Sequence, residues 1–136
     1  MKPALIDTDT LSYFFRNNPI VVEKLDKYLQ EYGFINLSVI TYYEVLNGLY
    51  FKDAKKQRKK FEEFVKLNQV LPLTDEVAKN AAKVYAQLRK KGKTVGHNDI
   101  LIASTAVTNN MTLITNNAKH FKDIEGLDMD NWSVEK

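Results

Sequence analysis

The sequence contains no cysteine, and this absence excludes several kinds of chemistry at once. Disulfides, thiolate metal ligands and cysteine nucleophiles all require that residue. No apolar run approaches the ~18 residues that are needed to cross a bilayer. The run of apolar residues after Lys2 is too short to be the apolar region of a signal peptide. We therefore expect a cytoplasmic protein that has no membrane partner.

Glycine and proline are also scarce, with five and three residues in a chain of 136. No stretch is rich enough in them to predict a linker, and the length predicts one domain over residues 1–136. The formal net charge is only +3. If several acids gather in one site, the remaining surface is more basic than this value suggests. A mildly basic surface fits a phosphate-bearing partner but does not demonstrate one.

Short apolar runs alternate along the chain with segments of helical periodicity. The predicted strands are residues 4–6, 34–38, 69–73, 111–115 and, at an edge of the sheet, 131–135. Apolar residues recur at helical spacing in residues 39–50, 77–88 and 98–109, the last of which we expect to begin at Asn98. This alternation predicts an α/β fold, a single-domain α/β/α sandwich with a central, mostly parallel sheet.

Acidic and amide side chains follow these elements at equivalent places. Asp7 ends the first strand, and Asn117 comes just after the fourth. Glu44 lies in the second turn of a helix that Ser38 is placed to cap, and Asp99 lies in the first turn of its helix. In a parallel sheet, strand carboxyl ends and helix amino ends share one edge, where ligands bind. We therefore predict that these acids and the amide meet at one rim.

Crowding determines what such a rim can do. Carboxylates a few ångströms apart repel one another, so one is protonated unless a cation neutralises them. Ligands that are all oxygen select hard cations, here Mg²⁺ or Mn²⁺. One or two such ions polarise a phosphodiester and lower the pKa of a bound water. The pattern favours a metal-dependent hydrolase that acts on phosphodiesters.

Each acid also has a structural explanation. Asp7 or Asp9 could cap the helix that is expected near Thr10. Asp99 could complement its helix dipole, and Glu44 could pair with a lysine. Taken alone, Asp7, Asp9 and Asp99 in these places are more often structural than catalytic, whereas for Glu44 the two explanations weigh about equally. It is the convergence of four polar positions that favours a site.

Two other functions compete with this interpretation. A phosphatase would use Asp7 as nucleophile and Asp9 as acid/base, which resembles the haloacid-dehalogenase motif. That motif then requires a hydroxyl, a lysine and an acidic pair, and too little chain follows Thr115 to position them. The second alternative is a non-catalytic binding module whose acids only dock a basic partner. An uncompensated acid cluster is costly without a cation, which favours the enzyme.

Four segments in order cover essentially the whole chain: LIDTDTLSYFFRNNP, INLSVITYYEVLNGL, GHNDILIASTA and LITNNAKHFKDIEGLDMDNW. Together they resemble PIN-domain ribonucleases, specifically the VapC-type toxins of toxin–antitoxin modules. The resemblance implies a Mg²⁺- or Mn²⁺-dependent endoribonuclease that uses a metal-activated water. It also implies an RNA substrate, a cognate antitoxin protein and a homodimer.

The resemblance also assigns residues. The acidic metal-site positions match Asp7, Glu44 and Asp99, and the neighbouring hydroxyls match Thr8, Ser38 and Thr115.

Many members of the family carry a fourth aspartate where this chain has Asn117. An amide oxygen brings no charge, so the resemblance leaves open whether one metal ion or two bind tightly. Asp9, which is often asparagine in relatives, is a further candidate ligand that could restore the missing charge.

The densest basic run is KKQRKK, at residues 55–60. We favour a solvated helix face here, since Glu62 and Glu63 can pair with Arg58 and Lys59 at helical spacing. The alternative is contact with the RNA backbone through Lys55, Lys56, Arg58 and Lys59. The helix before this run is richer in aromatic residues than one sheet face requires, and an oligomer or antitoxin contact would bury the excess.

Overall fold

A computed structural model of the chain describes residues 2–135. Within these residues, five strands form one sheet in the order β3-β2-β1-β4-β5. The strands are β1 (Ala4–Ile6), β2 (Asn36–Ser38), β3 (Gln69–Leu71), β4 (Thr112–Ile114) and β5 (Met129–Asp130). All four neighbouring pairs are parallel, so the carboxyl ends of the strands share one edge. This confirms the predicted fold class.

The prediction of a last strand over residues 131–135 is wrong. β5 lies at the sheet edge as expected, but it ends at Asp130. The side chain of Asn131 accepts hydrogen bonds from the N–H and the hydroxyl of Ser133, at 2.8 and 2.6 Å. This local turn competes with the ladder, as asparagine turns do. Trp132 is nevertheless buried, and its ring centroid lies 5.7 Å from that of Tyr28. Its apolar side chain thus belongs to a loop that packs on the core.

Seven helices occur in the described chain. They are α1 (Thr8–Phe15), α2 (Pro19–Tyr32), α3 (Val39–Phe51), α4 (Lys55–Lys66), α5 (Asp75–Lys90), α6 (His97–Thr108) and α7 (Ala118–Phe121). The expected start of α6 at Asn98 is corrected, since the helix begins at His97 with Gly96 as its N-cap. None of these helices is long and apolar enough to cross a membrane.

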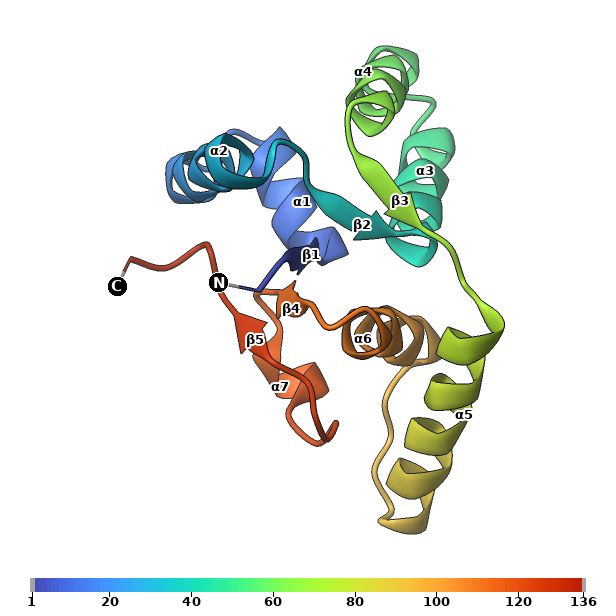
Figure 1. Ribbon diagram of the computed structural model, residues 1–136. Coiled ribbons are helices and arrows are strands. Elements are labelled where there is room, and N and C mark those ends of the chain that lie inside the picture. The colour runs from blue at the N-terminus through green and yellow to red at the C-terminus, as the bar shows by residue number, and fades with distance from the viewer. Residues whose placement is uncertain (1, 136) are drawn as a thin grey trace.

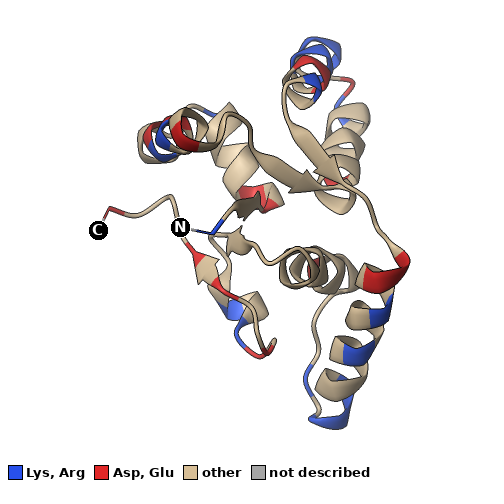
Figure 2. Ribbon diagram, in the orientation of Figure 1, with Lys and Arg blue, Asp and Glu red and all other residues tan. Residues whose placement is uncertain are grey.

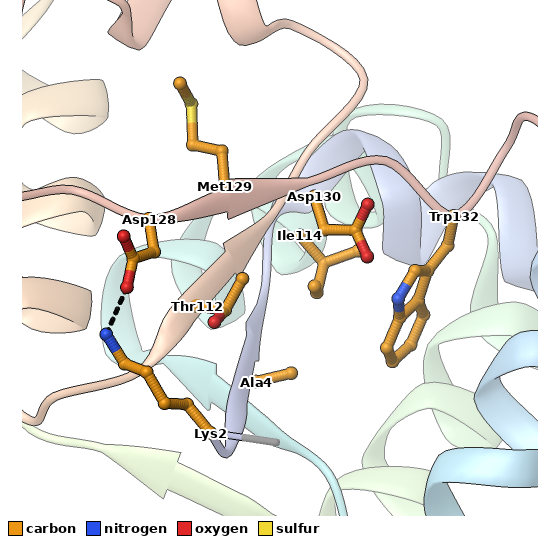
Figure 3. A pocket seen from close by; sticks show the side chains of 8 residues that line it. All are labelled: Lys2, Ala4, Thr112, Ile114, Asp128, Met129, Asp130 and Trp132. Atoms are coloured by element: carbon orange, nitrogen blue, oxygen red, sulfur yellow. Dashed lines mark hydrogen bonds and ion pairs between the residues drawn. The ribbon is translucent and has the colours of Figure 1, made fainter. Parts of the chain in front are cut away.

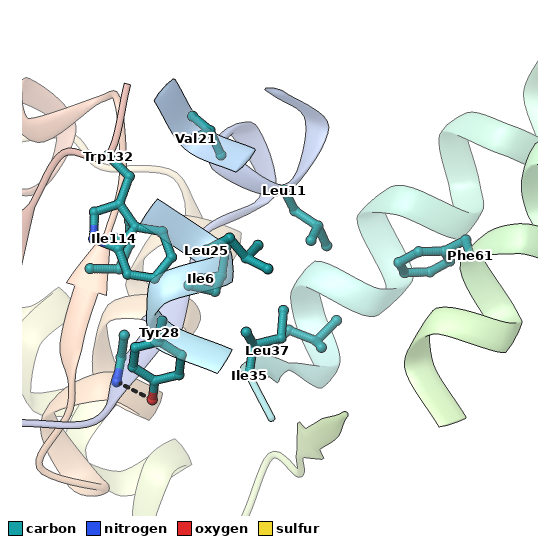
Figure 4. Packing of buried hydrophobic residues seen from close by; sticks show 11 residues of the cluster. Ile6, Leu11, Val21, Leu25, Tyr28, Ile35, Leu37, Phe61, Ile114 and Trp132 are labelled. Atoms are coloured by element: carbon teal, nitrogen blue, oxygen red, sulfur yellow. Dashed lines mark hydrogen bonds between the residues drawn. The ribbon is translucent and has the colours of Figure 1, made fainter. Parts of the chain in front are cut away.

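The helices form a layer on each face of the sheet (Figure 1). Alternate residues of β1 face opposite layers, because side chains alternate along a strand. Ala4 and Ile6 pack in a cluster with residues of α1, α2, α3 and α4, shown in Figure 4. Leu5 packs in a second cluster, with residues of α5, α6 and α7. β1 is thereby enclosed on both faces, and its carboxyl end is held in a fixed position.

Candidate active site

Asp7 lies at the point where β1 becomes α1. It is the N-cap of α1 and is only 5% exposed. One carboxylate oxygen accepts the N–H of Thr8 at 2.8 Å, and the other accepts the hydroxyl of Thr115 at 2.7 Å. Thr115 directly follows β4, the neighbour of β1 in the sheet. The first acid is therefore oriented by two adjacent strand ends, as the sequence predicts.

Asp9 lies in the first turn of α1, so it is Asp7 and not Asp9 that caps this helix. One oxygen of Asp9 accepts the N–H of Thr10 at 2.7 Å. The other accepts the backbone N–H of Asn116 at 3.1 Å. Asp9 thus faces the segment that leaves β4, on the side of the rim where Asp7 also lies.

Glu44 is brought to the same rim by α3. Ser38 caps this helix as predicted, because its hydroxyl accepts the N–H of Thr41 at 3.0 Å. The hydroxyl of Thr8 donates to Glu44 Oε1 at 2.6 Å, and Asn98 Nδ2 lies 3.4 Å from Oε2. In the described part of the chain no lysine or arginine pairs with Glu44, so the ion-pair explanation lacks a partner. Ser38 therefore affects the site indirectly, because it caps the helix that carries Glu44.

Asp99 lies in the first turn of α6, as expected. Its Oδ2 is 3.4 Å from Nδ1 of His120, which belongs to the short helix α7. The pKa of Asp99 is raised chiefly by burial; His120 opposes this, and the charges of Glu44 and Asp9 add to it. The sequence indicates for His120 a role in local structure or behind the metal ligands, but its contact with Asp99 could not be predicted, because no local pattern connects α6 with α7.

The electrostatics of Asp7 show that the acids share one environment. Burial, and after it the negative charge of Asp9, are the largest causes that raise the pKa of Asp7 from its ordinary 3.8 to about 7. The charge of Asp99 acts in the same direction, whereas the hydrogen bonds from Thr115 and Thr8 lower the pKa. Four carboxylates from three helices therefore influence one another at the carboxyl edge of the sheet.

The segment after β4 supplies amides to the rim. The side chain of Asn117 is exposed, and its backbone N–H donates to the Thr115 hydroxyl at 3.0 Å. Asn116, which the sequence did not single out, has both polar side-chain atoms buried and, among residues 2–135, without a hydrogen-bond partner. The only feature of the sequence that could have indicated Asn116 is its place between Thr115 and Asn117, which were both predicted to belong to the site.

The basic candidates lie elsewhere. Lys55, Lys56, Arg58 and Lys59 all belong to the first half of α4. α4 contacts α3, the helix that carries Glu44, but these side chains make no ion pair with the acids of the rim. The structure therefore brings together Asp7, Asp9, Glu44, Asp99, Thr8, Thr115 and Asn117, and leaves the lysines outside this group.

The donor set at the rim fits a hard divalent cation. All of its candidate ligands are carboxylate or amide oxygens, the type that Mg²⁺ and Mn²⁺ prefer. The unpartnered Asn116 amide beside Asp9 is a further oxygen donor in a buried position. Across the described chain, no three histidine, aspartate or glutamate side chains are arranged to hold a metal as they stand. A cation would therefore have to draw the carboxylates closer together.

A separate cavity of about 360 Å³ lies beside β4 and β5 (Figure 3). Two of its lining residues, Lys2 and Asp128, form an ion pair and precede strands β1 and β5. Its lining runs along the strands, from Thr112 at the start of β4 to Ile114 and Asp130 at the ends of β4 and β5. None of the acids of the rim lines it. The chemistry described above is therefore not located in this cavity.

Comparison with known proteins identifies the class to which this arrangement of parallel strands and acids belongs. Residues 4–127 match the PIN domain family. The chain therefore belongs to the PIN domain family, and its relatives within that family are named as VapC ribonucleases. Ribonuclease VapC2 of Rickettsia felis is 30% identical over 129 residues, covering 94% of this chain and 96% of that protein. Ribonuclease VapC1 of Haemophilus influenzae strain R2866 is 29% identical over 132 residues, covering 95% and 97%.

Solved structures of similar proteins have the same fold. VapBC from Salmonella typhimurium, solved with bound DNA, has a TM-score of 0.87 at 26% identity, covering 97% of this chain and 99% of that chain. VapBC2 from Rickettsia felis, solved with a DNA fragment from its promoter, has a TM-score of 0.85 at 28% identity, covering 95% and 98%. Both likenesses extend over nearly the entire length of each chain. The family resemblance seen in the sequence is thus confirmed.

Proposed function

We propose that residues 1–136 form one PIN-like nuclease domain that acts as a Mg²⁺- or Mn²⁺-dependent endoribonuclease. The observation that carries the proposal is the rim itself, where the charges of Asp9 and Asp99 raise the pKa of the buried Asp7. A structural role does not require carboxylates from separate elements to repel one another. The relatives named Ribonuclease VapC support RNA as the substrate.

Each residue of the rim has a role in this proposal. Asp7 and Asp99 hold the metal ion, which supplies positive charge that neutralises the acids and polarises the phosphodiester. Glu44 binds the ion or orients the attacking water, and its position is set by the Thr8 hydroxyl. Thr115 holds the Asp7 carboxylate in one orientation. Asn117 adds an amide oxygen.

Substitution of Asp99 tests the proposal. Asp99→Asn keeps the shape of the side chain and removes one charge, so we expect cleavage to be lost and the fold to be retained. Cleavage of total RNA with added Mg²⁺ gives the first readout, and circular dichroism gives the second. Asp26→Asn, on the exposed side of α2, is the matched control and keeps wild-type cleavage. Wild-type rates for Asp99→Asn would contradict the site assignment and favour a non-catalytic module.

We further propose that the protein is the toxin of a toxin–antitoxin pair and acts in the cytoplasm, where its RNA substrate lies. Its solved relatives include VapBC assemblies, and a toxin–antitoxin complex from Klebsiella pneumoniae has the same fold. We expect a cognate antitoxin to place an arginine or lysine near the acids, because a cation there compensates their charge. Co-expression with the adjacent reading frame should relieve growth arrest; unrelieved arrest would contradict the pairing.

The homodimer remains a prediction from the family resemblance. Light scattering of the purified protein at micromolar concentration should give twice the mass of one chain. A monomeric mass under the same conditions would overturn this prediction without affecting the nuclease proposal.

A further inference from the structure

One face of α3 leads outward from the acids of the rim. Glu44, Gly48 and Phe51 are spaced by four and three residues, so they lie on the same side of the helix. Seven residues of helix place Phe51 about 10 Å beyond Glu44 along the axis. Phe51 is 88% exposed, and a Cβ added at Gly48 would meet nothing within 4 Å. An open strip therefore connects the catalytic Glu44 with an exposed aromatic ring.

The aromatic surplus predicted for this helix divides into two parts. Tyr42, Leu46 and Leu49 pack against the hydrophobic cluster that includes β1. Tyr43 and Tyr50 remain 57% and 58% exposed. They are seven residues apart and therefore share one face of α3, which adjoins the face that carries Phe51. Exposed apolar side chains that lie next to one another mark interaction surfaces, whereas isolated ones are common on any protein. Only the exposed rings therefore call for a binding partner outside the chain.

The basic run on α4 lies directly beyond these rings. Residues 52–60 carry six cations and one carboxylate, so this segment alone exceeds the net charge of +3 of the whole chain. Figure 2 shows the lysine and arginine residues of α4 in blue. The predicted pairing of Glu62 and Glu63 with Arg58 and Lys59 is absent from the ion pairs of the described residues. Glu62 instead accepts the hydroxyl of Tyr42 at 2.6 Å.

Arg58 joins the cations to the rings. Its guanidinium carbon lies over the ring of Tyr50, 4.4 Å from the ring centroid, which is a cation–π contact. Such a planar arginine and its aromatic partner present a flat surface on which a base can stack. Lys55, Lys56, Lys59 and Lys60 are exposed and without ion-pair partners within residues 2–135, so they remain available to phosphates.

We propose that the basic aromatic surface, formed by Tyr43, Tyr50 and Phe51 of α3 and by Lys55, Lys56, Arg58 and Lys59 of α4, binds unpaired RNA and leads it to the acids of the rim. This inference rests on the proposed ribonuclease function and adds where the substrate lies and that it is single-stranded. Charge complementarity favours RNA, because an apolar protein segment would leave the lysines unpaired. Duplex RNA fits poorly, since its bases are already stacked on one another.

Binding measurements on an uncleaved probe test this surface. Every variant is made in the Asp99→Asn background and titrated, in the presence of EDTA, against a fluorescein-labelled oligouridylate by anisotropy. Phe51→Ala should weaken binding roughly tenfold, the loss expected for one stacked base. Combined replacement of Lys55 and Lys59 by Glu should also weaken binding. It should reduce the slope of log K against log salt by at least about 1, as expected when two phosphate contacts are lost.

Matched controls carry the same chemical changes at other places. Phe34→Ala removes a ring that is 43% exposed just before β2, away from the carboxyl edge of the sheet. Combined replacement of Lys83 and Lys90 by Glu reverses two exposed charges on α5. Both should bind the probe as tightly as the parent. Equal losses in the controls and in the test variants would show general electrostatic attraction and would overturn the assigned surface.

The outcomes separate this inference from the proposed function. If the wild-type chain cleaves RNA while Phe51→Ala and the lysine variant bind the probe normally, the surface assignment is wrong and the nuclease proposal stands. If both variants lose binding but the wild-type chain never cleaves RNA with any divalent metal, the surface stands and the nuclease proposal fails. A Phe51→Ala variant that keeps its RNA affinity but loses a co-expressed antitoxin would assign the surface to protein and overturn the inference.

Discussion

Replacing Asp7 by asparagine should stabilise the metal-free protein at neutral and alkaline pH, although it removes a proposed catalytic group. The pKa of Asp7 rises from the ordinary 3.8 to about 7 in the folded chain, chiefly through burial and then through the charge of Asp9. A buried carboxyl of this kind contributes its full stability at acid pH, where it is protonated in both states. That stability is lost between about pH 4 and pH 7, because only the unfolded chain has released its proton there.

The magnitude follows from the size of this shift. A displacement of about three pKa units corresponds to about 4 kcal/mol of unfolding free energy that wild-type protein lacks above pH 7. Asparagine carries no charge, and its carbonyl oxygen can still accept the N–H of Thr8. Its amide can donate to the hydroxyl of Thr115, which reverses the hydrogen bond seen here. The variant therefore avoids this loss of unfolding free energy and keeps the hydrogen bonds with both neighbours.

Thermal denaturation in EDTA measures the effect. The melting temperatures of wild type and Asp7→Asn should agree near pH 4 and should differ by roughly 10 °C near pH 8. Comparing the two proteins at each pH cancels the titration of the groups that do not interact with Asp7. Saturating Mg²⁺ should narrow the gap, because a bound cation compensates the charge of Asp7. Parallel curves with a constant difference across this range would refute the electrostatic reasoning.

Three further predictions concern single contacts. Asp9→Asn should raise the Mg²⁺ concentration that cleavage requires and Asn117→Asp should lower it, because they remove and add charge at the rim; superimposable Mg²⁺ titrations would contradict this. Ser38→Ala removes the cap of α3 and should reduce the unfolding free energy in urea by about 1 kcal/mol; an unchanged midpoint would exclude the capping role. Tyr28→Phe leaves the N–H of Ala4 without its 2.9 Å partner, which should reduce stability by about 1–3 kcal/mol; calorimetry showing wild-type stability would disprove it.

The strand-end rule predicted most of the site because it depends only on topology. Once the strands are parallel, Asp7 and Thr115 must lie at one edge, and helices that start there bring Glu44 and Asp99 beside them. The side-chain pairs could not be predicted in this way. The contact of His120 with Asp99 depends on how α7 packs against α6, which no local pattern encodes.

The errors in the fold have local causes. The strand predicted for residues 131–135 failed because Asn131 forms a turn, although the apolar pattern around Trp132 correctly indicated burial. Helix α2 was not predicted, even though Asn18 followed by Pro19 is a typical helix start. Its buried residues Val21, Leu25 and Tyr28 are spaced at a helical interval that was there to be recognised.

The central place of β1 has a consequence for how the protein is made. Asp7 leaves the ribosome early, but Thr115, which holds its carboxylate, follows 108 residues later. Until β4 has been synthesised, β1 lacks its neighbour on one side, and contacts this distant in sequence form slowly. A polypeptide that terminates before Thr115 has its first acid without the strand and the hydroxyl that orient it. An unfinished chain of this kind therefore lacks an arrangement on which the proposed ribonuclease activity depends, and we expect that activity only when translation is nearly complete.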